Sequence, residues 1–130
     1  MKKTFLGILF LGAIFLSLSF AIAAEITQLS KKASRLRLGM TRENVIRLLG
    51  KPKWAVIPND KGEFALSDRR IKLELHWHNP GCNPVVVQFN DMLKVTGWDE
   101  GRAFCGKDAR LFEPSDEYSC IKPDRDKFCK

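Results

Sequence analysis

Cysteine is absent from the first 81 residues of the chain, and this absence bears on how the N-terminus is processed. Lys2 and Lys3 precede a long apolar run, and residues 21–23 carry the Ala-Ile-Ala pattern at which secretory leaders are cleaved. The sequence therefore predicts a Sec-type signal peptide over residues 1–23. A lipid anchor needs a cysteine at the cleavage site, so we expect a soluble exported protein in a bacterial periplasm.

Charged residues are absent from residues 4–24, which leaves a second interpretation of this segment. About 20 apolar residues suffice to cross a bilayer, so an uncleaved leader would anchor the protein in the inner membrane. The small-residue pattern at the end of the apolar run favours cleavage. The remaining chain is long enough for one small domain with a modest core.

Clusters of basic residues are absent as well. The formal net charge is +7, and removal of Lys2 and Lys3 with the leader lowers it to +5, with the other basic residues scattered along the chain. This pattern does not predict binding to nucleic acid. It is compatible with a weak preference for acidic partners, or for anionic lipid heads in a peripheral membrane contact.

The cysteines that do occur lack the CxxC spacing that is typical of zinc sites. An even number of cysteines in a small exported chain predicts two disulfides. The residues concerned are Cys82, Cys105, Cys120 and Cys129. A nucleophilic role for Cys105 or Cys120 is the alternative, which an oxidising compartment disfavours.

One helix is predicted over residues 42–49. Thr41 is a suitable N-cap residue, Gly50 can adopt the positive φ that ends a helix, and Pro52 prevents its continuation. The apolar residues of this segment recur at helical spacing and form one face: Val45, Ile46, Leu48 and Leu49.

After this helix the apolar residues change to a period of two, which is typical of strands. Trp54 and Val56 suggest a short first strand, and longer runs follow over residues 71–77, 85–89 and 93–97. We expect the three longer runs to form an antiparallel meander with one apolar face. The helix covers that face, which gives a small two-layer α+β sandwich.

The side chains of the meander also indicate its register. If Trp77 faces Val85, and Phe89 faces Leu93, then Val85 faces Gly97 and every pair on the apolar face is apolar or glycine. A slip by one residue would turn these side chains to the wrong face.

The same register bears on the disulfides. Extension of the last hairpin brings Cys82 close to Cys105, which favours the pairing Cys82–Cys105 and Cys120–Cys129. Four cysteines allow three pairings, and the sequence does not decide among them.

The other face of the second run is polar. His76 and His78 lie two residues apart on it beside Glu74 and could chelate a metal ion. A solvated polar face that includes Lys72 is the favoured alternative, so we predict no metal or other cofactor. Acidic residues elsewhere fall on turns and form no acid–base pair, so no enzymatic activity is predicted. They are Asp60, Asp68, Asp91, Asp99 and Glu100.

Trp98 is the one candidate residue for binding a partner. By alternation it falls on the face opposite Val95 and Gly97, where an exposed tryptophan could anchor a protein partner. The alternative is that residues 102–130 fold over Trp98 and bury it. The other tryptophans, Trp54 and Trp77, are expected in the core.

Two stretches carry a family resemblance. The helix start Leu38-Gly39-Met40-Thr41 and the helix end Leu48-Leu49-Gly50, with Pro52, resemble the SmpA/OmlA (BamE-like) family of small Gram-negative envelope lipoproteins. The hairpin over residues 85–97 looks like the closing hairpin of that family. The resemblance covers roughly residues 36–98. The chain departs from the family in lacking the lipobox cysteine and in carrying a cysteine-rich extension.

The resemblance implies a fold and a role. The fold is two helices on an antiparallel three-stranded sheet, similar to half of a β-lactamase inhibitor protein. The role is that of a non-catalytic interaction module, and the best-known member supports the machinery that inserts outer-membrane β-barrels.

We therefore predict a BamE-like domain over residues 24–98 and a disulfide-bonded extension over residues 99–130. The expected function is a periplasmic protein–protein interaction module that binds envelope proteins, among them the outer-membrane assembly machinery. The alternative is an inhibitor of an envelope hydrolase, or a binder of anionic lipid headgroups, on the same fold.

Overall fold

The computed structural model describes residues 28–58, 70–102, 105–106 and 113–130, so the predicted signal peptide lies outside the described residues. In chain order the elements are α2 (Gln28–Ala33), α3 (Arg42–Leu49), β1 (Trp54–Val56), β2 (Leu73–Trp77), β3 (Val85–Phe89), β4 (Val95–Asp99), η2 (Asp116–Tyr118) and α4 (Pro123–Asp126). The described chain is a mixed α+β protein, as predicted. None of its helices is long and apolar enough to cross a membrane.

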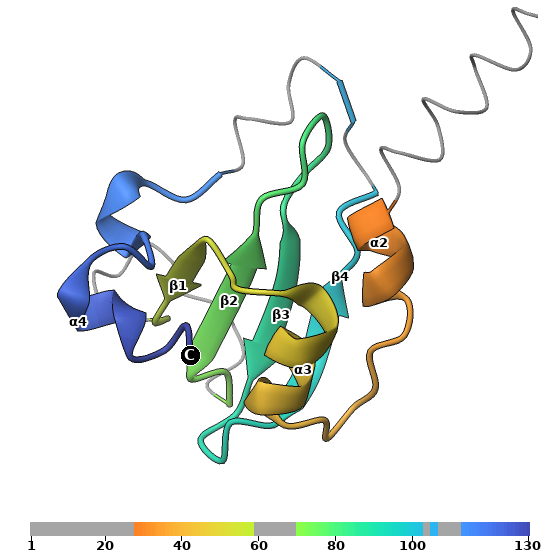
Figure 1. Ribbon diagram of the computed structural model, residues 1–130. Coiled ribbons are helices and arrows are strands. Elements are labelled where there is room, and N and C mark those ends of the chain that lie inside the picture. The colour runs from red at the N-terminus through yellow and green to blue at the C-terminus, as the bar shows by residue number, and fades with distance from the viewer. Residues whose placement is uncertain (1–27, 59–69, 103–104, 107–112) are drawn as a thin grey trace, which may run out of the picture.

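The strands form one antiparallel sheet in the order β1-β2-β3-β4, so the predicted meander of three strands was one strand short. The added strand is β1, where Trp54 pairs with His76 and Val56 with Glu74. Its three residues contain only two of the alternating apolar positions, which is too few to specify a partner strand. Helices α2 and α3 lie against one face of the sheet, and η2 and α4 lie beside β1 at its edge (Figure 1).

The register of β2 and β3 is the predicted one. Trp77 pairs with Val85, Leu75 with Val87 and Leu73 with Phe89. All six side chains are buried, and they form the floor of the main core. The period-two pattern sufficed here because both strands are regular along their full length.

The predicted register of β3 and β4 was wrong. Phe89 pairs with Val95 instead of Leu93, and an irregularity between Gln88 and Phe89 leaves Val87 opposite Trp98. Thr96 is therefore the extra residue of a β-bulge.

The β3–β4 turn explains this shift. The Asn90 side-chain oxygen accepts hydrogen bonds from the backbone N–H groups of Met92 and Lys94, and Leu93 adopts a φ of 55°. The Asn90 backbone N–H donates to the Lys94 carbonyl at 3.0 Å. Residues 90–94 therefore connect the paired residues Phe89 and Val95, whereas the predicted turn comprised residues 90–92 only. A positive φ at a leucine is uncommon, and the apolar pattern gives no sign of it.

Helix α3 has the predicted limits. The Thr41 side chain accepts the Asn44 backbone N–H at 3.3 Å, and Gly50, at a φ of 88°, donates its N–H to the Ile46 carbonyl at 2.8 Å. Val45 and Leu49 are buried against the sheet. Ile46 and Leu48, the other two residues of the predicted apolar face, are half-buried and pack at the margin of the core.

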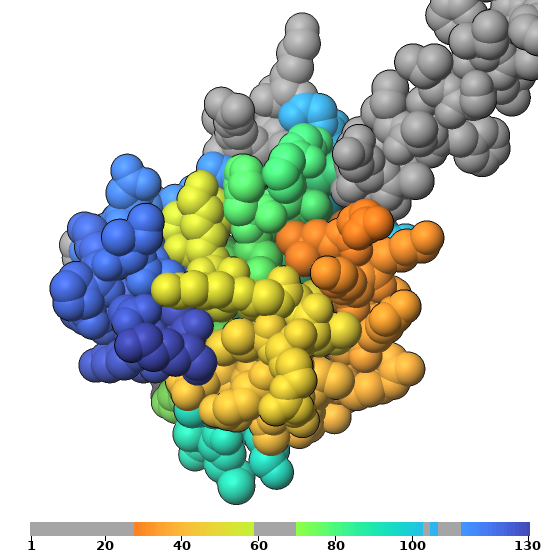
Figure 2. Space-filling view, in the orientation of Figure 1, coloured from red at the N-terminus to blue at the C-terminus, as the bar shows by residue number. Residues whose placement is uncertain are grey.

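The helix and the sheet are also joined by a hydrogen bond. The indole N–H of Trp77, in β2, donates to the carbonyl of Gly50 at 2.8 Å. This bond gives the buried Trp77 ring a partner for its polar atom and satisfies a carbonyl just beyond the end of α3. Figure 2 shows α2 and α3 covering the sheet on this side.

The C-terminal segment is held by disulfides and backbone pairing. Cys82 is bonded to Cys105, and Cys120 to Cys129, which is the pairing that the predicted register favours. Cys120 and Cys129 are both buried in the main core. The Cys120 backbone N–H donates to the Lys53 carbonyl at 2.9 Å, next to β1, so this segment extends the sheet edge.

Candidate functional site

The cysteines are all engaged in disulfides. Because Cys105 and Cys120 have no free thiol, neither is a nucleophile in this structure. Their function here is to close the chain on itself at two places. Cys82 lies in the loop between β2 and β3, and it also forms an isolated antiparallel bridge with Cys105. The first disulfide therefore joins this loop to the segment after β4.

The outer face of the sheet, which is the face away from α2 and α3, carries a buried polar cluster. Glu74 is 4% exposed and His76 is 5% exposed, so the predicted solvated face was wrong for both. The carboxylate of Glu74 contacts the His76 ring at 3.0 Å from Nε2 and accepts a 3.1 Å hydrogen bond from the Gln88 amide. Within the described residues, His76 Nδ1 is buried without a hydrogen-bond partner.

A second apolar cluster, which comprises Trp54, Val56 and Tyr118, adjoins this polar cluster on the same face. Trp54 and Val56 lie on the outer face because they stand directly opposite His76 and Glu74. Trp54 is buried as predicted, although it belongs to this smaller cluster and not to the core beneath the helices. Trp54 and Val56 belong to β1. Tyr118 belongs to η2, which follows β2 by about 40 positions in the sequence.

The two histidines do not form a joint metal site. His78 lies further along the strand, where its Nδ1 contacts Glu113 at 2.8 Å and its ring meets the Trp54 ring edge-on. Each histidine thus has its own carboxylate partner. In the described part of the chain, no group of three or more histidine, cysteine, aspartate or glutamate side chains gathers as a metal site would require.

Trp98 lies on the face opposite to the predicted one. The bulge places it directly across from Val87, so its ring is half-buried and packs against the main core. The prediction failed because one extra residue in a strand reverses the facing of every residue beyond it. The partner-binding role of Trp98 remains a prediction. The argument for it was an exposed ring, and the ring is half-buried.

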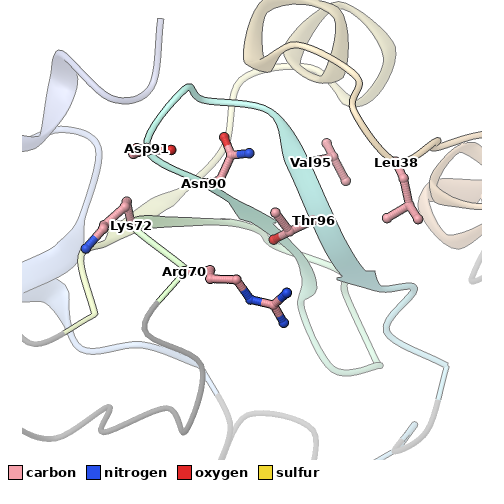
Figure 3. Close-up of a pocket in the computed structure, with 7 residues that line it drawn as sticks. All are labelled: Leu38, Arg70, Lys72, Asn90, Asp91, Val95 and Thr96. Carbon is pink, nitrogen blue, oxygen red and sulfur yellow. The ribbon is translucent and has the colours of Figure 1, made fainter.

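A pocket of about 630 Å³ lies at the end of the β3–β4 hairpin. Its lining comes from four parts of the chain: the loop before α3, the segment before β2, the hairpin turn and the start of β4 (Figure 3). The lining residues are Leu38, Arg70, Lys72, Asn90, Asp91, Val95 and Thr96.

Two of the loops that line the pocket each carry an exposed aliphatic side chain. Leu38 and Met92 are each 70% exposed, whereas most large apolar side chains in the described residues are buried or half-buried. The loops that carry them are fixed to each other: Gly39 donates its N–H to the Val95 carbonyl at 2.9 Å, and Arg42 donates to the Leu93 carbonyl at 3.1 Å. We call Leu38, Met92 and the pocket lining the hairpin-end surface. Its turn protrudes from the body of the protein in Figure 2.

Charged groups gather at one end of this pocket. Figure 3 shows Lys72 and Asp91 on the side away from Leu38, with Thr96 nearer the middle of the pocket. Arg70 adds a second positive charge, so the lining has two cationic side chains and one anionic side chain. The side of the pocket away from Leu38 therefore carries charges of both signs, whereas Leu38 and Val95 make the opposite side apolar.

Sequence patterns did not indicate this surface. Leu38 and Gly39 were interpreted as part of a helix-start signature, and Asp91 as a turn residue. The available signal was the presence of large aliphatic residues, Leu38 and Met92, in two segments that are otherwise typical of turns. No protein-family model matches the chain, and no curated protein and no solved structure matches it either.

Proposed function

We propose that the chain is a non-catalytic interaction module of the bacterial cell envelope, which binds another envelope protein through the hairpin-end surface. The observation that carries the proposal is the pair of exposed aliphatic side chains, Leu38 and Met92, on a fixed backbone beside a pocket. Burial of such side chains in a partner is a common source of binding energy, since a few central residues dominate most interfaces.

Two further observations support the compartment and the class of protein. Two disulfides are typical of exported proteins, because the cytosol keeps thiols reduced. The helix motif and hairpin resemble the SmpA/OmlA family, whose members are envelope interaction modules. We therefore propose a periplasmic location after cleavage of residues 1–23, and the outer-membrane assembly machinery as the first partner to test.

A second candidate function is the binding of anionic lipid headgroups. Arg70 and Lys72 favour it, since they place two positively charged side chains in the pocket lining. Inhibition of an envelope hydrolase is a special case of the first proposal, because it would use the same kind of protein contact.

The decisive experiment compares capture of partners from an envelope extract by single variants of the purified protein. Leu38→Glu and Met92→Glu should each reduce capture of the same partner by about tenfold or more, since each variant places a charge in the proposed interface. Ile121→Glu is the matched control, because Ile121 is 90% exposed and lies in the C-terminal segment beside β1.

The outcomes separate the candidates. A partner retained equally by all three variants would place the interface elsewhere. Sedimentation with phosphatidylglycerol vesicles tests the lipid alternative, which predicts binding without any protein partner. N-terminal sequencing of the envelope form tests export, and an unprocessed or lipid-modified N-terminus would contradict cleavage after Ala23.

A further inference from the structure

We propose that the pocket of the hairpin-end surface is a carboxylate-binding site, which takes an acidic side chain of a protein partner while the neighbouring apolar residue of that partner packs on Leu38. The inference rests on the proposed function and goes further, because it names the chemistry of the segment that docks. It is carried by the distribution of charge and of hydrogen-bond donors around the pocket.

Lys72 supplies the principal positive charge. Within the described residues its ammonium group has no ion-pair or hydrogen-bond partner, and its side chain is exposed. Its backbone is nevertheless fixed, because its N–H donates to the Phe89 carbonyl at 2.9 Å and continues the β2–β3 ladder. An exposed ammonium group without a partner, on a fixed stretch of backbone at the pocket, can turn toward an incoming anion and pair with it.

Asn90 adds donors of a defined orientation. Its side-chain oxygen is occupied by the backbone N–H groups of Met92 and Lys94, at 3.0 and 3.1 Å. The amide is therefore held in one orientation, and only its NH₂ group is left for a ligand. Such a group matches a carboxylate oxygen and does not match another donor.

The apolar end of the pocket selects the rest of the ligand. Leu38 and Val95 lie at the end opposite Lys72 (Figure 3). A ligand that satisfies both ends has an acidic group and an aliphatic group close together, as an acidic residue next to a leucine does in an extended segment. Met92, in the same hairpin turn as Asn90, is exposed and offers a further apolar contact to a protein segment that continues past the pocket.

Asp91 opposes this binding and so offers a sharp test. Its carboxylate lines the same end of the pocket as Lys72 and repels a second carboxylate. Removal of the Asp91 charge should strengthen binding of an acidic ligand, whereas reversal of the Lys72 charge should weaken it. A contact driven by apolar burial alone would respond to neither change.

The experiment is a titration of isotope-labelled protein, with both disulfides intact, followed by nuclear magnetic resonance. The probes are acetyl-leucyl-glutamyl-leucinamide and the counterpart in which glutamine replaces glutamate. The glutamate peptide should shift the Asn90 side-chain amide and the Thr96 backbone amide, with affinity at least fivefold higher than that of the glutamine peptide.

The variants sharpen the result. Lys72→Glu should weaken the glutamate peptide about tenfold, and Asp91→Asn should strengthen it about threefold. Lys94→Glu is the matched control: it changes the net charge as much as Lys72→Glu does, but Lys94 does not line the pocket. Its effect should stay within twofold.

Three results would overturn the inference: equal affinity for the two peptides, shifts confined to other parts of the protein, or equal effects of Lys72→Glu and Lys94→Glu. Lys72-dependent binding to phosphatidylglycerol vesicles without peptide binding would assign the pocket to lipid instead. If Leu38→Glu abolishes partner capture and Lys72→Glu does not, the docking surface stands and the carboxylate site fails. If neither variant affects capture, both proposals fail.

Discussion

The two faces of the sheet are built from opposite chemistries, and along β2 both are buried. The face under α2 and α3 is apolar along β2, β3 and the start of β4. The outer face carries the carboxylate of Glu74, the imidazole of His76 and the amide of Gln88, arranged as one hydrogen-bonded group beside Trp54 and Val56.

The difference shows that alternation along a strand reports the chemistry of each face and not its exposure. All five residues of β2 are buried, although every second one is polar. The helix-facing side is stabilised by removal of apolar surface from water, and disruption there leaves a cavity. The outer side depends on a pair of ionisable groups that stabilises the fold only while both partners are present.

The largest effect is expected on the helix-facing side. Phe89→Ala should lower the free energy of unfolding by about 3–5 kcal/mol, because it empties a fully buried position in the main core. Val86→Ala, on the outer face of the same strand and half-buried, is the matched control and should cost less than about 1.5 kcal/mol. Urea denaturation followed by circular dichroism measures both. Equal costs would mean that the helices do not form the principal core.

A change at Glu74 should cost nearly as much, for a different reason. Glu74→Ala should lower the free energy of unfolding by roughly 3 kcal/mol, since it leaves the buried His76 ring and the half-buried Gln88 amide without their acceptor. The double variant Glu74→Leu with His76→Leu removes the pair together and should recover most of that loss. If the double variant is the less stable of the two, the polar pair contributes net stability, and the contrast between the faces is smaller than we infer.

Loss of the disulfide between Cys120 and Cys129 should have an intermediate effect. Cys120→Ala with Cys129→Ala should cost about 2 kcal/mol, a modest value because the loop that it closes is short. The near-ultraviolet circular dichroism of Trp54 and Tyr118 should also change, because the segment that holds Tyr118 against Trp54 and Val56 is released. An unchanged spectrum would show that Tyr118 is held by its other contacts.

The smallest effect concerns pH and the C-terminal segment. The hydrogen bond from Lys130, with a further contribution from Lys51, lowers the pKa of Asp126 below its ordinary value of 3.8. The ionised carboxylate therefore stabilises the fold above that value, and this stabilisation is lost as the pH falls through the lowered pKa. Asp126→Asn should be slightly less stable than the parent at pH 7 and indistinguishable from it in strong acid. A titration midpoint at the ordinary value for Asp126 would contradict this.

Local patterns predicted the parts of the fold that depend on short stretches of chain. Thr41 and Gly50 marked the limits of α3, because capping uses groups within one turn of the helix. The register of β2 and β3 followed from regular alternation. The register of β3 and β4 did not, since it depends on a five-residue turn in which Asn90 holds two backbone N–H groups and Leu93 takes a positive φ.

By itself, then, the sequence determined the α+β class, the capped helix, one strand register and a set of cysteines suited to two disulfides. The tertiary structure decided the facing of Trp98, the burial of Glu74 and His76, and the pocket beside Leu38. Helix caps and alternation arise from neighbours in the chain, so they can be inferred from order alone. Burial and pockets arise where segments far apart in sequence meet, and a single extra residue at a bulge changes which side chains those segments present to each other.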